Sequence, residues 1–572
     1  MAFGKRCINT KLIRMKRVFV LLVVAICVQQ MTAQNLLLQT LKSEANRNLT
    51  ELKKQPVPAY YISYRVYDVK VHYVSASFGE LIYSRPTTQR YFNVSVRVGS
   101  PTMDNTREIK ESNERGYADY NSSGYGMLGL EDNQDAWKIT LWQKTDAMYV
   151  DATKRYEKVK ANVAVKVSSE DKSNDFSLEK PEIYLEKPVK FSDAKFDAKV
   201  WEEKLKKYSA VFNENKEIIN STFSFEIELT HKYFVDTEGA EIFENRFCYR
   251  LMMSASGKAD DGMDIPLYKS CFAYDPKELP SDAEVLADAR LLSETISKLR
   301  TAPVADSYSG PMLMSGQAAS VFFHEIFGHR IEGARLKSET DAQTFKKKMG
   351  EMVLPEDISV IFEPYTRRAN GFDMNGYYIF DDEGVRGQRV EIVKNGKLTS
   401  FLMNRTPIEG FPNSNGHGRG MIQLNTFTRQ SNTLIESTKP KSENELRAML
   451  VEQLKTEGKE YGYLMDQVSG GFTTTGRYMP NAFNVTPYLV YRIFADGRPD
   501  EMVRGVDLVG TPLAIFSQIA ACGTDYGVFN GYCGAESGSV PASCVSPTLY
   551  VKMVETQRKA RSQSQPPILE RP

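Results

Sequence analysis

Two of the five histidines in the 572-residue chain, His324 and His329, lie in one short apolar segment. This segment, residues 315–333, reads SGQAASVFFHEIFGHRIEG. Its small and apolar residues predict a short buried helix, with Ser315 available as the N-cap. Two histidines beside Glu325 are the residue types of a zinc hydrolase, in which imidazoles bind the ion and a carboxylate moves a proton.

The spacing of this motif, H-E-x-x-x-H, predicts an irregular helix. In the zinc-protease motif H-E-x-x-H, the histidines are about 40° apart around the helix. His324 and His329 are five residues apart. In a regular α-helix, this spacing would separate the two side chains by about 140° around the helix axis. A π-type turn, or a helix that ends between them, would let both rings reach one ion, and Gly328 permits such a departure. The alternative is that both are ordinary histidines of a core helix.

The start of the sequence has the features of a secretory signal. Lys16 and Arg17 precede an apolar run of 11 residues, 18–28, and small residues follow near Ala33. The run is too short for a membrane span, which needs about 20 apolar residues. We therefore expect a signal peptide over residues 1–34, an exported protein that is periplasmic or extracellular, and no membrane span after cleavage.

Removal of the signal leaves an odd number of cysteines: Cys248, Cys271, Cys522, Cys533 and Cys544. In an oxidising compartment, Cys248 could pair with Cys271 and Cys522 with Cys544, which leaves Cys533 over. A free thiol there is exposed to oxidation, whereas a metal thiolate is partly protected.

Cys533 is therefore the preferred third ligand of a catalytic zinc ion, and His417 is the other candidate. Such a site keeps one position for water, and Glu325 is the predicted general base, which takes a proton from that water and returns it to the leaving amine.

Length and charge limit the remaining possibilities. A chain of 572 residues is long enough for two or more domains. Its net charge of +1 gives no electrostatic case for nucleic-acid binding. Residues 35–300 are expected to form an N-terminal α/β domain, residues 301–555 a C-terminal metalloprotease domain, and residues 556–572 a disordered tail. Within the first domain, the pattern predicts helices at 36–55, 196–216 and 281–300, and strands at 60–166 and 221–256.

Several motifs in order resemble those of the TldD/PmbA family of metallopeptidases. They are HEIFGHRIEG at 324–333, FDDEG at 380–384, GHGRG at 416–420, RQSNT at 429–433, SGGF at 469–472, YRIFADGRP at 491–499 and CGAESGSVPASCVSPTLYVKMV at 533–554. The resemblance covers close to half of the chain.

The resemblance implies an α+β fold, in which a curved antiparallel, barrel-like C-terminal sheet carries a short metal-binding helix. It implies a metal held by His324, His329 and Cys533, and substrates that are peptides or unfolded proteins. It also implies a homodimer, or a heterodimer with a related subunit that lacks the motif, around an internal chamber. This chain has the motif and is similar to the catalytic type.

The sequence thus predicts an exported zinc-dependent metallopeptidase. The alternative is a non-catalytic envelope protein of the same fold that binds or chaperones peptides. Arg419 and Arg429 are weak candidates for binding the substrate, with a structural ion pair as the other interpretation. The acidic cluster at 381–383 is interpreted as a solvated turn, a cation site or a set of partners for the histidines.

Overall fold

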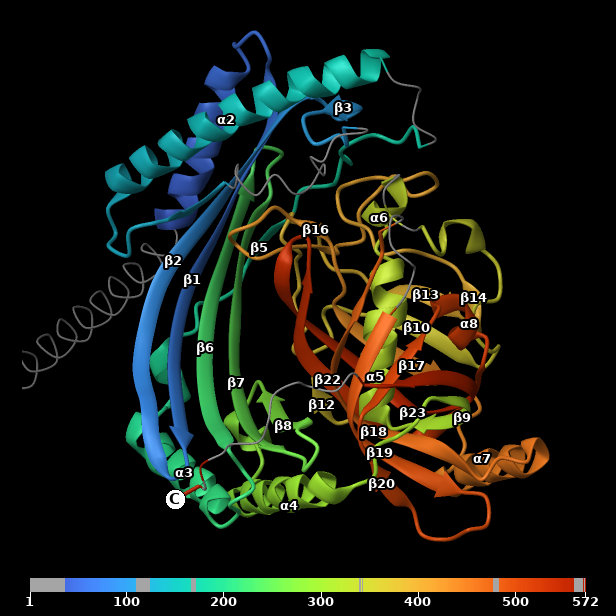
Figure 1. Cartoon of the computed structure of the whole chain (residues 1–572). Coiled ribbons are helices and arrows are strands. Elements are labelled where there is room, and N and C mark those ends of the chain that lie inside the picture. Colours follow the sequence, from blue (N-terminus) through green and yellow to red (C-terminus); the bar gives the residue numbers. More distant parts are fainter. Residues whose placement is uncertain are drawn as a thin grey trace, which may run out of the picture.

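Two large β-sheets organise the chain (Figure 1). The computed structural model describes residues 36–109, 124–165, 171–338, 341, 343–476, 483–559, 569 and 571–572. An eight-stranded sheet is built from the N-terminal half and an eleven-stranded sheet from the C-terminal half, and helices flank both. The predicted α+β class is confirmed.

The N-terminal sheet is dominated by long antiparallel strands. Its order is β3-β2-β1-β6-β7-β5, with β4 beside β2 and β8 beside β7. The strands are β1 (Ala59–Ser77), β2 (Glu80–Ser100), β3 (Met103–Asp104), β4 (Tyr125–Met127), β5 (Ile183–Leu185), β6 (Asn220–Asp236), β7 (Glu241–Lys258) and β8 (Asp264–Ala273). Their β-branched and aromatic residues suit a pleated sheet with one buried face.

Helices cover the two ends of this sheet. A helix over residues 36–52 and α2 (Gln134–Val165) lie at one end, and α3 (Ala198–Ala210) and α4 (Asp282–Thr301) lie at the other (Figure 1). Helix α4 confirms the helix predicted at 281–300, and it begins with a capping box formed by Ser281 and Glu284.

The strand prediction for residues 137–156 was wrong, because this segment lies within α2. Its Trp, Ile, Thr, Tyr and Val content favours strands. The buried side chains nevertheless recur at helical spacing: Trp137, Leu141, Thr145, Ala152 and Val159. Packing of that stripe against β1 and β2 decides the conformation.

The C-terminal sheet follows the order β14-β13-β10-β17-β23-β21-β19-β18-β9, with β20 beside β19 and β22 beside β23. Its strands are β9 (Tyr308–Met314), β10 (Ile358–Phe362), β13 (Val390–Lys394), β14 (Lys397–Leu398), β17 (Asn432–Ser437), β18 (Tyr461–Thr473), β19 (Phe483–Phe494), β20 (Glu501–Val503), β21 (Val506–Gly510), β22 (Ile519–Ala535) and β23 (Gly538–Arg558). Because β23 also pairs with β9, the pairings among β9, β18, β19, β21 and β23 form a closed circuit. The barrel-like shape stays a prediction.

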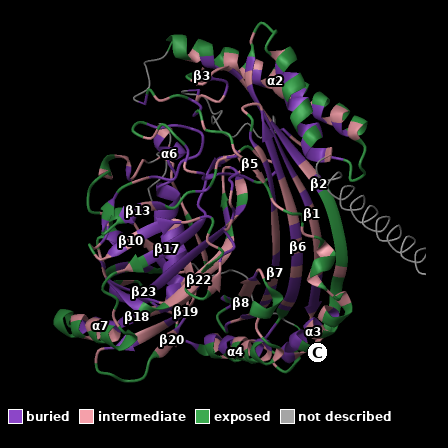
Figure 2. Cartoon of the chain, turned by 180° about the vertical axis from the view of Figure 1, so that it is seen from behind, coloured by how far each residue is buried: buried purple, intermediate pink, exposed green. Residues whose placement is uncertain are grey.

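The short helix α5 (Gly316–Phe322) packs against β18, β22 and β23. Phe322, Phe323 and Phe327 surround Phe516 of α8 (Pro512–Phe516), with ring centroids 5.5 to 6.1 Å away. Seen from behind, the strands around this core are mostly buried, whereas α7 (Glu443–Glu457) is largely exposed (Figure 2). The core therefore fixes the helix that leads into the motif.

Smaller elements complete the described part of this half: α6 (Ala334–Lys337), β11 (Arg368–Ala369), β12 (Phe372–Asp373), β15 (Gly418–Arg419) and β16 (Phe427–Thr428). Strand β23 continues to Arg558, three residues beyond the predicted end of the domain. Residues 1–34, predicted as a signal peptide, and most of the predicted tail lie outside the described residues. No helix in the described part of the chain has both the length and the apolar character needed to cross a membrane.

Buried charges join the two halves at the acidic cluster. Asp382 accepts a hydrogen bond from Tyr67 at 2.6 Å and forms ion pairs with Lys232 at 3.1 Å and Arg65 at 3.2 Å. Burial opposes ionisation of Asp382, but Lys232 and Arg65 hold its pKa well below the usual range. For Asp381, burial and the charge of Glu383 raise the pKa to about 8. The cluster is thus a buried junction and not a solvated turn.

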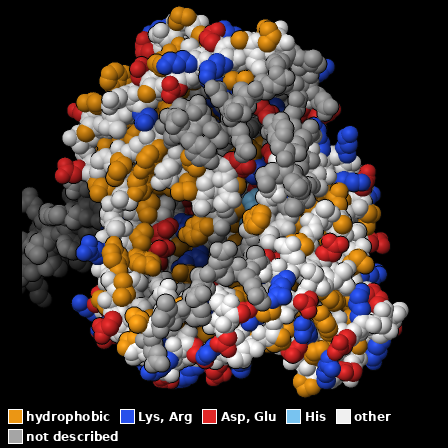
Figure 3. Space-filling view, viewed as in Figure 1, with side chains coloured by type: hydrophobic (Ala, Val, Ile, Leu, Met, Phe, Trp, Pro, Cys, Tyr) orange, Lys and Arg blue, Asp and Glu red, His pale blue; other side chains and the backbone are white. Residues whose placement is uncertain are grey.

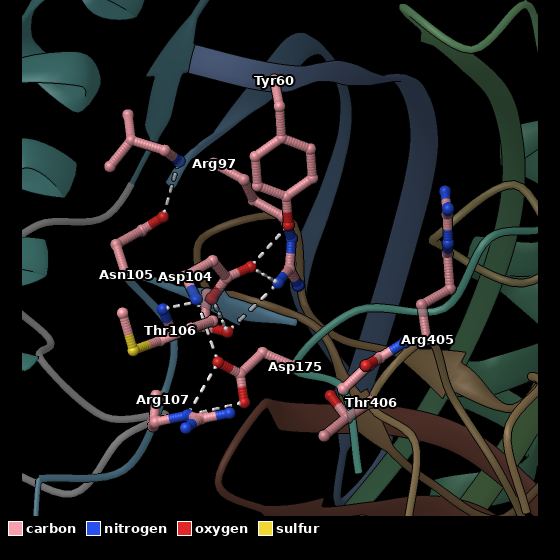
Figure 4. A network of polar contacts seen from close by, with 12 residues as sticks. Tyr60, Arg97, Asp104, Asn105, Thr106, Arg107, Asp175, Arg405 and Thr406 are labelled. Atoms are coloured by element: carbon pink, nitrogen blue, oxygen red, sulfur yellow. Dashed lines mark hydrogen bonds and ion pairs between the residues drawn. The ribbon is translucent and has the colours of Figure 1, made fainter. Parts of the chain in front are cut away.

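A second polar network lies where the turn after β2 meets the segment near Asp175 (Figure 4). Asp104 is fully buried and accepts hydrogen bonds from Tyr60 at 2.6 Å and Arg97 at 2.7 Å, and Asp175 accepts one from the Asp104 amide at 2.9 Å. The guanidinium of Arg405 lies 3.8 Å from the ring of nearby Phe176, which ties the C-terminal half to this network.

Candidate metal centre

The motif helix is irregular at the predicted place. Ser315 caps α5 by accepting a hydrogen bond from the Ala318 amide at 3.2 Å. A π-helical turn at Phe323–Phe327 and a 3-10 turn at Gly328–Arg330 then follow α5 directly. These turns bring the rings of His324 and His329 to a centroid distance of 5.5 Å. The predicted departure from a regular helix is confirmed.

A close approach of two chain segments makes glycine necessary at position 328. A Cβ atom added to Gly328 would lie 1.9 Å from Oε1 of Gln430. The side chain of Gln430 in turn donates a hydrogen bond from Nε2 to the backbone oxygen of His324 at 3.1 Å. The absent side chain therefore lets Gln430 hold the π-helical turn.

Substitution of this glycine is expected to destabilise both the fold and the site. Gly328→Ala must displace Gln430, and overpacking of this kind costs about 1–3 kcal/mol. Chemical denaturation measures this loss, and Gly129→Ala is a matched control, because a Cβ at Gly129 meets only one atom, at 3.8 Å. Equal stability of the two variants would contradict the steric argument.

Cys533 of β22 lies next to the two motif histidines and forms with them a group of three possible metal ligands. Its Sγ lies 3.3 Å from Nε2 of His329, and one ligand atom from each of His324, His329 and Cys533 lies within 4.8 Å of the others. All three residues are buried, and no other group of three potential metal ligands occurs in the part of the chain that the structure describes.

The other ligand candidate, His417, lies outside this group. Its Nδ1 is 2.9 Å from Oδ1 of Asn415 and its Nε2 is 3.1 Å from Oγ of Ser431. Burial lowers its pKa to about 3, so the ring stays neutral. The structure thus brings Cys533, and not His417, to the motif histidines.

The predicted disulfides are wrong, since the five described cysteines are free. Cys271 lies opposite Leu251 on β7, so it faces the other side of the sheet from Cys248. Cys522 lies opposite Leu549 of β23, five residues along that strand from Cys544. Neither pair can reach the Cα separation of a disulfide, which is below about 7 Å.

The donor atoms of this group suit a zinc ion. His329 directs Nδ1 toward Glu332, at 3.4 Å, which leaves Nε2 directed at Cys533. Nδ1 of His324 is buried and has no hydrogen-bond partner in the structure. In tetrahedral coordination, with metal–ligand bonds of about 2.0–2.3 Å, neighbouring donors are roughly 3.5 Å apart. The 3.3 Å between Nε2 of His329 and Sγ of Cys533 fits that geometry.

The charges around the group favour a cation. Burial opposes ionisation of the Cys533 thiol, but His329, His324 and Arg429 lower its pKa well below the usual range. Burial would lower the pKa of His329, but Cys533 and Glu332 raise it to about 10. A position that retains a proton this strongly has a negative potential, which also attracts a metal ion.

Glu325 lies beside the three ligand atoms. Its Oε2 is 4.0 Å from Nε2 of His329, and its side chain is 14% exposed. A Cβ added to Gly471 on β18 would lie 3.0 Å from Cγ of Glu325, so this strand borders the carboxylate. Burial raises the pKa of Glu325. An ion held by the three ligand atoms would therefore lie close to this carboxylate, which could exchange a proton with a water there.

The comparisons with known proteins agree with this geometry. Residues 307–558 match the family model described as PmbA/TldA metallopeptidase C-terminal domain. A metalloprotease of Methanothermobacter thermautotrophicus is 27% identical over 339 residues, which are 59% of this chain and 69% of that protein. Residues 307–558 therefore form a C-terminal domain of the PmbA/TldD metallopeptidase type.

Two further proteins are similar to this chain. A zinc metalloprotease TldD homologue of Saccharolobus solfataricus is 25% identical over 47% of this chain and 55% of its own length. The crystal structure of TldE from Thermococcus kodakarensis covers 90% of this chain and all of its own, with a TM-score of 0.61 and 14% identity. The structural likeness shows that the fold extends through both halves of the chain.

The two arginines predicted to bind substrate are engaged by the protein itself. Arg429 is fully buried and donates hydrogen bonds to Cys533 O, to Ser537 Oγ at 2.9 Å and to Gly538 O at 2.7 Å. Arg419 donates to the backbone oxygens of Gln430 at 2.7 Å and Pro541 at 2.6 Å. These bonds tie both arginines to the hairpin of β22 and β23, and a role in substrate binding stays a prediction.

Sequence reasoning missed Glu332, which contacts His329 from three residues away. Its signal was present in the segment HRIEG, because a residue three positions after a histidine can face it across one helical turn. Arg335 also contacts this carboxylate from three residues away, whereas the contact of Arg429 with it, across 97 residues, could not be read from a local pattern.

Proposed function

We propose that this chain is an exported zinc-dependent metallopeptidase that hydrolyses peptide bonds in unfolded proteins or peptides. The observation that carries the proposal is the meeting of His324, His329 and Cys533 within 4.8 Å, with Glu325 beside them. Relatives named as metalloproteases, one of them as a zinc metalloprotease, support it.

Each residue has a role that its position allows. His324, His329 and Cys533 hold the ion, which would polarise the scissile carbonyl and lower the pKa of a bound water to about 7. Glu325 accepts the proton of the attacking water at its carboxylate and then gives it to the leaving amine nitrogen. Glu325 follows His324 in the π-helical turn, and its Oε2 lies 4.0 Å from Nε2 of His329.

The proposal also covers location and assembly. The basic and apolar segment at 16–28 supports export to the periplasm or the extracellular space. The resemblance of its motifs to the TldD/PmbA family supports a dimer with a second copy or with a related subunit that lacks the motif. The molecular face in Figure 3 is hollowed between the N-terminal sheet and the C-terminal half, which supports entry of an extended chain.

Removal of the metal is expected to abolish cleavage. The purified chain should contain about one zinc per polypeptide by elemental analysis, because the described residues supply one three-ligand group. A chelator should reduce hydrolysis of an unfolded protein, such as reduced and alkylated casein, to background, and added Zn²⁺ should restore it.

A folded protein of similar size serves as the control substrate, and it should resist cleavage. A chain without zinc, or one that cleaves casein equally well after chelation, would contradict the proposed function. Zinc binding with no hydrolysis would instead favour the non-catalytic, peptide-binding alternative.

A further inference from the structure

Glu332 is a buried carboxylate to which the proposed chemistry assigns no role. It follows the 3-10 turn of the motif and has no exposed surface. Its Oε2 accepts hydrogen bonds from Nε of Arg335 at 2.8 Å and from Nδ1 of His329 at 3.5 Å, and its Oε1 lies 3.4 Å from the same Nδ1. Nε of Arg429 forms an ion pair with Oε1 at 3.8 Å.

The same two arginines also contact the hairpin formed by β22 and β23, which carries Cys533. Arg335 donates one hydrogen bond to each carboxylate oxygen of Glu536, both at 2.6 Å. Arg429 donates to the backbone oxygen of Cys533 and to Gly538 O. Two bridges therefore lead from Glu332 to the hairpin, and we call Glu332, Arg335, Arg429 and Glu536 the Glu332 network.

Burial makes this network costly unless every charge is paired. The side chains of Glu332 and Arg429 are 0% exposed and that of Arg335 is 5% exposed. Charges lose their hydration at such positions, and removal of one partner leaves the others uncompensated. A network of this kind holds its members in one arrangement, and here the arrangement connects both elements that supply metal ligands.

We propose that Glu332 is the positioning residue of the metal site. Its Oε2 accepts the Nδ1 proton of His329, which leaves the lone pair of Nε2 directed at the ion position. Through Arg335 and Arg429 it also fixes the hairpin so that Cys533 Sγ stays within ligand distance of His329. The inference rests on the metal site of the proposed function.

The affinity for zinc tests the proposal directly. In the full-length chain, Glu332→Gln keeps the shape of the side chain but removes the charge that both arginines face. The dissociation constant of Zn²⁺, measured by competition with a chromophoric chelator, should increase by about 10–100-fold. Glu332→Asp keeps the charge and should recover part of this loss.

Glu244→Gln is the matched control. Glu244 is also a buried carboxylate, but it accepts hydrogen bonds from the amides of Ile379 and Phe380 and pairs with Lys232. Its substitution should leave the zinc affinity at the wild-type value. Circular dichroism of the metal-free variants establishes that each is folded.

A spectroscopic readout separates positioning from general stability. Co²⁺ in place of zinc gives a thiolate charge-transfer band that reports the bond to Cys533. Glu332→Gln should weaken or shift this band, because the hairpin loses one end of both bridges, whereas Glu244→Gln should leave it unchanged.

Glu536→Gln keeps the proposal testable if Glu332→Gln does not fold. The side chain of Glu536 is 24% exposed, so the substitution is easier to accommodate, and it removes the outer end of one bridge. We expect a several-fold loss of zinc affinity. Wild-type affinity and an unchanged cobalt spectrum in the folded variants would overturn the role of Glu332, whereas a wild-type chain without zinc would overturn the proposed function.

Discussion

Glu325→Gln should lower peptide cleavage by about 10²–10⁴-fold while the zinc content stays at the wild-type level. The amide has nearly the shape of the carboxylate but cannot accept the proton of the attacking water. Glu325 lies beside the group of His324, His329 and Cys533 without belonging to it, so the ion should be retained. Initial rates on alkylated casein and elemental analysis of the same preparation provide the two measurements.

A surface glutamate provides the control for this change. Glu391 on β13 is 39% exposed and pairs only with Lys394 of the same strand among the contacts described for it, so Glu391→Gln should leave both cleavage and zinc unaltered. Wild-type cleavage by Glu325→Gln would contradict its role as base. Loss of zinc from this variant would show that the carboxylate helps to hold the ion.

Cys533→Ser should weaken zinc binding by more than about 10–100-fold, the loss typical when a residue that only holds a metal ligand is changed. Cleavage should fall with it. Sγ of Cys533 lies 3.3 Å from Nε2 of His329, so it is placed to share an ion with that ring. A serine hydroxyl is smaller and does not ionise near neutral pH, so it is a poor ligand for zinc. The zinc dissociation constant is the quantity to measure.

Cys271→Ser is the matched control, because Cys271 is a free, partly buried thiol on β8 of the other sheet. It should bind zinc as the wild type does. An unchanged dissociation constant in Cys533→Ser would refute the ligand assignment and return attention to His417, although His417 is bonded to Asn415 and Ser431 in the structure.

The motif shows how far sequence reasoning can reach. Because an α-helix turns by about 100° per residue, the five-residue spacing of His324 and His329 excludes a regular helix at a shared ion. The π-helical turn at Phe323–Phe327 is the result of that constraint. Periodicity likewise located α4 and the long strands β6 and β7, where local pattern and tertiary packing agree.

Other features depend on contacts that no local pattern contains. The segment 137–156 has strand-forming residues, and only packing on β1 and β2 makes it a helix. Pairing of Cys522 with Cys544 was plausible by count, but the register of β22 and β23 separates them. The role of Arg429 could not be inferred either, because its partners Cys533 and Gly538 are more than 100 residues away.

The separation of the ligands along the chain has a consequence for folding. His329 and Cys533 are 204 residues apart, so an ion bound by both closes a very long loop. Such an ion acts as a reversible cross-link between the end of α5 and the β22–β23 hairpin, and only the native state has the complete set of donors. At a free zinc concentration of 100 times Kd, mass action alone would add about 2.7 kcal/mol to the free energy of unfolding. The availability of zinc in the compartment would then control how long the protein persists as well as whether it cleaves.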